Sequence, residues 1–402
     1  MLRNSNACPL SLVFGCIAIV AIFAGPIQAQ KIVLTNSNGN TLEVEIGDDK
    51  EKDDRVPVDV AILLDTSNSM DGLISQARNQ LWQIVTRLSE TEKDGRKPAL
   101  RVSVFEYGNT RLPATENYLR QVLPLSDDLD KVSEALFALT TNGGDEYCGA
   151  VIGEAVKRLD WSSDSDAYKS IFIAGNEAFT QGQISYLNTC ADAKEKNIIV
   201  NTIHCGDHST GVNGMWADGA EKGGGKNFNI DQDQKRVSIP CPQDKILIEL
   251  NTKLNKTYLW FGSKKSRGSN SRRQIAQDAK AFNGWGSGYK RSLSKASGIY
   301  DNRSRDLVDG ASSGSIEIES LDAELLPEEM QKLNVEERKK YVADNAAKRK
   351  EIQEQIKQVA KDREAYLETQ LAKDGKDKNT LGDVIVEALD EQLDDLGFEA
   401  SK

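Results

Sequence analysis

The sequence predicts an α/β fold, with a doubly wound, mostly parallel sheet covered by helices on both faces and a C-terminal helical region. From Val58 to about Leu259, short apolar runs alternate with amphipathic stretches at the spacing of βα units. The apolar runs are nearly continuous, which is typical of parallel strands buried on both faces. Beyond Ile316, apolar residues recur mostly at three- and four-residue steps, which is the period of a helix.

The first 29 residues have the pattern of an export signal. Arg3 lies near the start, an apolar stretch runs from Leu10 to Ala24, and Ile27-Gln28-Ala29 resembles a cleavage site. The apolar stretch is shorter than the roughly 20 residues that a membrane-spanning helix needs. We therefore expect an exported protein, periplasmic or extracellular, without a transmembrane segment.

Charge and cysteine content narrow the class of protein further. The net charge of −11 argues against nucleic acid as a partner, because nucleic-acid binding depends on clustered basic residues. Four cysteines lie beyond the signal: Cys148, Cys190, Cys205 and Cys241. An even number of cysteines in an exported chain predicts at least one disulfide, and the spacing leaves three pairings open.

Residues 30–55 are expected to form an N-terminal hairpin and an acidic linker. Residues 31–46 place two alternating apolar segments on either side of an Asn/Gly turn, the pattern of a β-hairpin. The next nine residues, 47–55, are too charged to pack in a core. A compact domain therefore begins near Val56.

Within residues 56–262 the alternating pattern predicts the order of elements in the main domain. The expected strands are 58–64, 100–106, 169–174 and 198–203. The expected helices lie near 72–89, 127–139, 147–159, 183–196 and 243–257.

The rest of the chain divides into a connector and a helical tail. Residues 263–315 are rich in Gly, Ser and Arg and are expected to form a mobile, locally basic connector with a possible helix near 273–282. Residues 316–402 are charged and helical, with Asn334 and Glu337 as a capping pair for one long helix and a short acidic helix near 381–396. We expect these helices to pack on the main domain or to form an oligomer contact.

The most informative motif is Asp65-Thr66-Ser67-Asn68-Ser69, which follows an apolar strand and precedes an amphipathic helix. In an open α/β sheet this position is the carboxyl end of a strand, where ligands bind. A carboxylate and two hydroxyls supply the oxygen ligands that Mg²⁺ prefers. The alternative is that Asp65, Ser67 and Ser69 cap the following helix, since Asp and Ser are favoured at that position.

At this motif the chain resembles the von Willebrand factor type A family, whose metal-ion-dependent adhesion site opens with Asp-x-Ser-x-Ser after the first strand. The resemblance covers about residues 56–260. Residues 143–152, 171–182, 200–206 and 250–262 are similar to a group of exported bacterial proteins with this domain. The resemblance implies a divalent metal, Mg²⁺ or Mn²⁺, held by Asp65, Ser67 and Ser69.

Two departures from the family pattern concern the remaining ligands. The second loop of the family usually offers a Thr after glycines, where this chain has Asp145. The third loop usually offers an Asp directly after the strand, where this chain has Gly175 followed by Asn176 and Glu177. Asp145, Asn176 and Glu177 are therefore candidate ligands. The alternative is that Asp145 caps the next helix and Glu177 is solvated.

The leading hypothesis for function is a binding or adhesion protein that recognises a protein or cell-surface ligand through the metal-bearing face. The alternative is a structural or assembly protein of the cell envelope, in which the type A fold is a scaffold without functional metal and the helical tail contacts the partner. We expect no enzymatic activity, because no nucleophile, base and orienting group occur together.

Overall fold

The computed structural model describes residues 30–35, 41–46, 54–231, 241–283, 288–371 and 381–400. The chain divides into two units, residues 1–52 and 53–402. In the first unit, β1 (Gln30–Thr35) pairs antiparallel with β2 (Thr41–Ile46), as the hairpin pattern predicted. The expected signal, residues 1–29, lies outside the described residues, and so do residues 47–53 of the linker.

A six-stranded sheet forms the centre of the second unit. Its strands are β3 (Val56–Asp65), β5 (Pro98–Tyr107), β6 (Leu119–Ser126), β7 (Tyr168–Gly175), β8 (Ile199–Cys205) and β9 (Gly224–Ile230). The strand order is β6-β5-β3-β7-β8-β9, and only the β5–β6 pair is antiparallel. The doubly wound, mostly parallel sheet is therefore confirmed.

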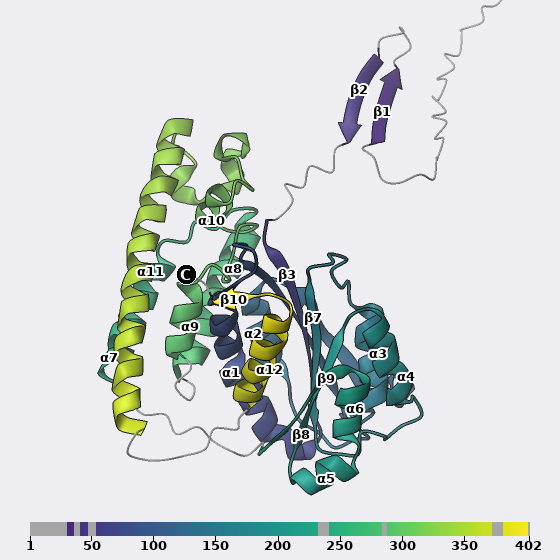
Figure 1. The fold of residues 1–402 in the computed structure, drawn as a ribbon. Helices are drawn as coiled ribbons and strands as arrows, with labels where there is room; N and C mark the ends of the chain where they lie inside the picture. Colours follow the sequence, from purple (N-terminus) through teal and green to yellow (C-terminus); the bar gives the residue numbers. More distant parts are fainter. Residues whose placement is uncertain are drawn as a thin grey trace, which may run out of the picture. The chain divides into compact units, whose positions relative to one another are not determined.

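Helices cover both faces of this sheet (Figure 1). One face packs against α1 (Asp71–Ser89), α2 (Leu129–Ala138) and α12 (Leu381–Asp395). The other packs against α3 (Cys148–Arg158), α4 (Tyr186–Glu195) and α6 (Trp216–Lys222). A hydrophobic core lies on each face of the sheet. Alternate residues of β3 pack into the two cores, with Ile62 on the first face and Leu63 on the second.

In the central sheet and the helices between its strands, β6, β9, α5 and α6 were not predicted from the sequence. β6 carries Pro124 and is only partly buried, and β9 has the polar sequence GGKNFNI. Both are edge strands of the sheet, so neither needs the continuous apolar run of a central strand. The helices α5 (His208–Asn213) and α6 are six and seven residues long, too short to show a clear helical period.

The expectation of a mobile connector at residues 263–315 differs from the structure. This segment forms α8 (Lys264–Asn283), α9 (Gly288–Lys295) and α10 (Leu307–Ser312). Arg291 and Lys295 are fully buried, and both contact the carboxylate of Asp278, at 2.8 and 3.0 Å. The composition misled because other basic residues of the segment, Arg291 and Lys295, are buried against an acid that the local composition does not reveal.

The long helix α11 (Val335–Leu371) begins where the capping pair predicted. Asn334 Oδ1 accepts from the backbone N–H of Glu337 at 2.9 Å, and Glu337 Oε2 accepts from that of Asn334 at 3.0 Å. The helix packs against α7 (Pro242–Asn255) and α9. Arg349 interrupts the apolar stripe but is buried, donating to Asp306 at 2.7 Å.

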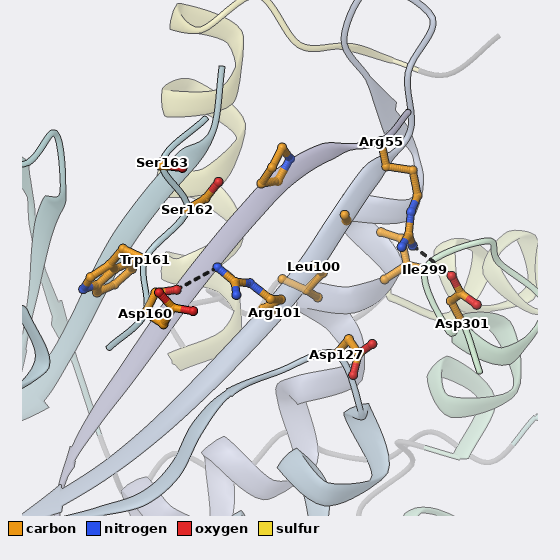
Figure 2. A pocket seen from close by; sticks show the side chains of 12 residues that line it. Arg55, Leu100, Arg101, Asp127, Asp160, Trp161, Ser162, Ser163, Ile299 and Asp301 are labelled. Atoms are coloured by element: carbon orange, nitrogen blue, oxygen red, sulfur yellow. Dashed lines mark hydrogen bonds and ion pairs between the residues drawn. The ribbon is translucent and has the colours of Figure 1, made fainter. Parts of the chain in front are cut away.

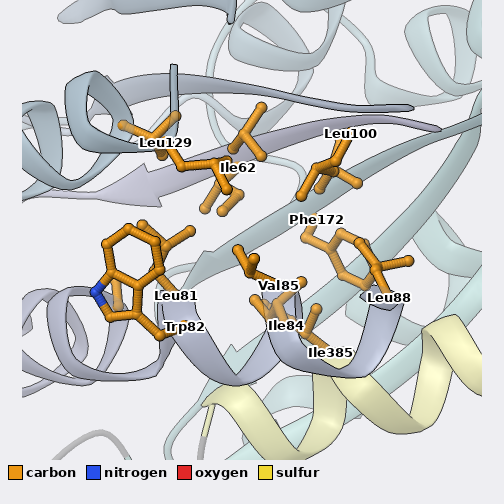
Figure 3. Packing of buried hydrophobic residues seen from close by; sticks show 14 of the residues in the cluster. Ile62, Leu81, Trp82, Ile84, Val85, Leu88, Leu100, Leu129, Phe172 and Ile385 are labelled. Carbon is orange, nitrogen blue, oxygen red and sulfur yellow. The ribbon is translucent and has the colours of Figure 1, made fainter. Parts of the chain in front are cut away.

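The last helix, α12, belongs to the core of the sheet rather than to a separate tail. Its residues Leu381, Ile385, Leu389 and Leu393 join the same hydrophobic cluster as α1 and β3. Figure 3 shows α1 side chains between the sheet and α12, which contributes Ile385. Residues 316–402 therefore lie in the same compact unit as the sheet. Among the described helices, none has the length and apolar character needed to cross a bilayer.

The disulfide prediction is wrong for the four cysteines that the structure describes, because all four are buried free thiols. Cys148 and Cys190 lie on one face of the sheet and Cys205 on the other. Cys241 lies apart from them, at the start of α7. An even cysteine count carries no information about which side of a sheet each thiol faces.

We expect alkylation of the denatured protein, without any reductant, to modify all four of these cysteines. The thiols are shielded in the folded state, where burial raises the pKa of each. Peptide mass spectrometry would check the modification site by site. Recovery of a cross-linked pair of cysteine peptides would contradict this expectation.

Candidate metal centre

Asp65 ends the central strand β3, between the carboxyl ends of β5 and β7. It is fully buried, and its Oδ1 accepts from the backbone N–H of Ser67 at 2.7 Å. The Ser67 and Ser69 hydroxyls lie 3.3 Å apart. The main chain is held by a bond from the Thr66 N–H to the Tyr107 carbonyl, at 2.8 Å.

The capping alternative for this motif has no support in the hydrogen bonds. Ser67 precedes the 3₁₀ turn Asn68–Met70 but makes no side-chain cap bond to it. Helix α1 begins after Met70, also without a side-chain cap. The two serine hydroxyls therefore remain at the edge of the sheet, next to Asp65.

The second loop turns Glu146, not Asp145, toward Asp65. Asp145 is exposed, and its Oδ2 accepts from the Tyr147 hydroxyl at 3.1 Å. Glu146 is 4% exposed, and its side chain lies against the Asp65 carboxyl. Sequence reasoning missed Glu146 because the family pattern pointed to the preceding residue. No local pattern distinguishes the two acids, because Glu146 lies in an irregular loop just before α3.

The facing carboxyls of Asp65 and Glu146 have unusual electrostatics. Burial, followed by the nearby Asp65, raises the pKa of Glu146 to about 9. Burial is also the main reason that the pKa of Asp65 is raised. Asp65 Oδ2 and Glu146 Oε2 are buried without a hydrogen-bond partner. Two buried carboxyls in contact need a proton or a cation between them.

The third loop brings Asn176 to the same place and leaves Glu177 outside. Asn176 Nδ2 donates to the Ser69 hydroxyl at 3.2 Å, while its Oδ1 is buried without a partner. The Glu177 side chain is exposed. Two contacts fix the main chain here: Trp216 Nε1 donates to the Glu177 carbonyl at 2.8 Å, and His204 Nε2 lies 3.3 Å from the Asn176 carbonyl.

Tyr107 explains why β7 ends in a glycine. Its hydroxyl donates to the Ala174 carbonyl at 3.0 Å and occupies the space beside Gly175. A Cβ atom at position 175 would collide with that hydroxyl and approach the Asp65 Cβ to 3.2 Å. An aspartate at position 175 therefore does not fit, which leaves Asn176 as the candidate oxygen ligand of this loop.

The residues at this edge fit a hard divalent cation. Their donors are all oxygens: the carboxylates of Asp65 and Glu146, the amide of Asn176, and the hydroxyls of Ser67 and Ser69. Oxygen ligands of this kind suit Mg²⁺ or Mn²⁺. Among the described residues, no group of three or more His, Cys, Asp and Glu side chains has a metal-binding arrangement.

The sheet and its oxygen-lined carboxyl edge define a doubly wound α/β domain with one polar site after the first strand. Residues 59–234 match the family model of the von Willebrand factor type A domain, so the chain contains a domain of that family. The match runs from β3 to just beyond β9. Domains of this family often hold a divalent metal at this edge, and membership supports a role in binding or adhesion in general.

Several solved structures are similar to part of this chain at low identity. BatB from Bacteroides thetaiotaomicron is 16% identical over 56% of this chain and 99% of that chain, with a TM-score of 0.33. Proximal thread matrix protein 1 from the mussel byssus, solved with zinc in its MIDAS motif, is 17% identical over 45% of this chain and 43% of that chain, with a TM-score of 0.33.

The pilus adhesin SpaC from Lactobacillus rhamnosus GG is 13% identical over 44% of this chain and 28% of that chain, with a TM-score of 0.33. The match thus covers less than half of the length of the byssus and pilus proteins. These similarities are too remote to indicate a ligand. Among curated proteins, no sequence matches the chain.

Proposed function

We propose that this chain is an exported, non-catalytic binding protein that recognises a protein or cell-surface ligand through a divalent metal on its type A domain. The observation that carries the proposal is a group of three buried oxygens without hydrogen-bond partners: Asp65 Oδ2, Glu146 Oε2 and Asn176 Oδ1. Buried polar atoms rarely stay unpaired, and a cation would satisfy all three.

In this proposal Asp65 and Glu146 supply the charge, while Asn176, Ser67 and Ser69 supply neutral oxygens. The bound metal would offer a coordination position to an oxygen atom of the partner. Two carboxylates balance the charge of a divalent ion, so the ion attracts an acidic group less than it would with a single carboxylate. The exposed acids Asp145 and Glu177 add negative charge around the site. A neutral oxygen ligand from the partner suits this surface better than a carboxylate.

We expect Mg²⁺ or Mn²⁺ to raise the melting temperature of the protein, and Asp65→Ala to abolish that increase. A ligand that binds only the folded state stabilises it, by about 2.7 kcal/mol at a hundredfold excess over Kd. Glu146→Gln should remove most of the shift, because it removes the second buried carboxylate. Differential scanning calorimetry and titration calorimetry would measure both effects.

Asp145→Asn is the matched control, because it removes a neighbouring but exposed carboxylate from the same loop. It should leave the Mg²⁺-induced shift within about 1 °C of that of the unmodified protein, since a surface charge has little effect on stability. If Asp145→Asn removes the shift and Glu146→Gln does not, the ligand assignment is wrong. If the unmodified protein binds neither metal, the scaffold alternative replaces this proposal.

A further inference from the structure

A pocket of about 380 Å³ opens at the amino edge of the sheet, opposite the candidate metal centre. It is formed by the first residues of β3 and β5, the loop before β7, and residues near Asp301. Leu100 and Ile299 contribute apolar walls. Figure 2 shows Asp160 and Trp161 on one side of the pocket, and Arg55 and Asp301 on the other. A volume of this size accommodates one large side chain or a small ligand.

The two arginines of the pocket already have partners. Arg101 donates to both oxygens of the fully buried Asp59, at 2.8 and 2.7 Å, and to the Asp160 carbonyl at 3.0 Å. Arg55 pairs with Asp301 at 3.0 Å. Because each guanidinium is matched by a carboxylate, neither leaves a strong site for an anion.

Two carboxylates of the pocket are less well matched. Asp160 is exposed; Arg101 attracts the carboxylates of Asp160 and Asp127 electrostatically, but its guanidinium makes its carboxylate hydrogen bonds to Asp59. Asp127 is 65% exposed and lies 3.9 Å from Arg305, which is 2.9 Å from Asp128. The lining therefore favours a cation over an anion.

The wall that carries Asp160 and Trp161 is ordered before any ligand arrives. Trp161 Nε1 donates to the Ala155 carbonyl at 3.2 Å, which fixes the indole ring. The backbone N–H of Ser162 donates to Asp59 Oδ2 at 2.8 Å, which fixes the loop. An aromatic ring beside a carboxylate is a recurring environment for a guanidinium or ammonium group. Little conformational entropy is lost when a ligand enters such a site.

We propose that this pocket binds the basic side chain of a partner polypeptide, with Asp160 and Asp127 contacting the cation and Trp161 contacting its planar or aliphatic part. The site is separate from the metal centre, which lies at the other edge of the sheet. It therefore gives the protein a second recognition point that needs no metal.

The test uses N-acetyl-arginine amide as the probe and N-acetyl-citrulline amide as its neutral isostere. The indole N–H signal of Trp161 is assigned by its loss in Trp161→Phe and then followed in the full chain by NMR. The arginine probe should shift this signal saturably, while citrulline should bind at least about tenfold more weakly, because it lacks the charge.

The double variant Asp127→Asn, Asp160→Asn should weaken binding of the arginine probe about tenfold or more. Both residues are exposed, so the variant should fold normally. Asp192→Asn, which removes an exposed acid on α4, should bind like the unmodified protein. Equal binding of the two probes, or an unchanged Kd in the double variant, would overturn the proposal. Asp65→Ala should bind the arginine probe normally, so failure of the metal proposal is distinguishable from failure of this one.

Discussion

Replacing Leu389 by alanine is expected to lower the free energy of unfolding by about 2–5 kcal/mol. Leu389 is fully buried in the cluster that α12 shares with α1 and the sheet. Its truncation would leave a cavity where those elements meet. Chemical denaturation, with the midpoint and slope compared between variants, would measure the change.

Leu396→Ala is the matched control, since Leu396 lies just beyond the same helix and is 40% exposed. It should change the free energy of unfolding by no more than about 0.5 kcal/mol. Similar losses in the two variants would show that α12 is not part of the core. If α12 is part of the core, deleting residues 381–402 should have a larger effect than Leu389→Ala. It should abolish cooperative unfolding, because it removes the whole apolar face of α12.

Specific polar contacts support this expectation for α12. Gln392 Oε1 accepts from the Tyr168 hydroxyl at 2.7 Å, and Gln392 Nε2 donates to Asn201 Oδ1 at 2.7 Å. Arg87 on α1 pairs with Asp390 at 2.5 Å. Without α12, the buried side chains of Tyr168 and Asn201 would lose hydrogen-bond partners. This loss would lower the free energy of unfolding further than the loss of apolar contacts alone.

Asp278→Asn is expected to destabilise the protein by about 3–5 kcal/mol at neutral pH. Asp278 contacts two fully buried cations, Arg291 and Lys295, and the substitution removes the negative charge between them. Arg291 keeps a second partner, Asp130 at 2.7 Å, but Lys295 has only uncharged oxygens left, those of Asn251 and Asn255. Asp344→Asn, which breaks an exposed pair with Lys340 on α11, should cost less than about 1 kcal/mol.

The effect of Asp278→Asn should depend on pH in a defined direction. Lys295 and Arg291 hold the pKa of Asp278 well below its ordinary value of 3.8, although burial acts in the opposite direction. A depressed pKa contributes stability that is fully present above the unfolded-state value and is lost as the pH falls through the folded-state value. The difference between the two proteins should therefore shrink as the pH falls below about 3.8. A difference that widens in acid would contradict this assignment.

Sequence reasoning succeeded where the signal is local. The central strands β3, β5, β7 and β8 were predictable because each is an apolar run long enough to be buried on both faces. The start of α11 was predictable because Asn334 and Glu337 cap it through side chains only three residues apart. The Asp65 motif was predictable for the same reason, since a single loop contains all of its residues.

Other features depend on contacts between residues far apart in the chain. The basic helices α8 and α9 are ordered because Arg291 and Lys295 meet Asp278 and Asp130, and no local pattern in a Gly- and Ser-rich segment reveals those partners. The four cysteines are free thiols, and the sheet separates Cys205 from Cys148 and Cys190. A count of thiols cannot predict that separation.

The sequence by itself determined the fold class and the position of the candidate metal-site motif, because the hydrophobic periodicity and the loop residues that indicate them lie within short stretches of the chain. Only the tertiary structure decided which other side chains are candidate donors. It turned Glu146 inward and Asp145 outward, and the Tyr107 hydroxyl left no room for a side chain at Gly175. Which of two adjacent acids faces a site depends on the packing of neighbouring strands, and that packing forms only when distant segments of the chain come together.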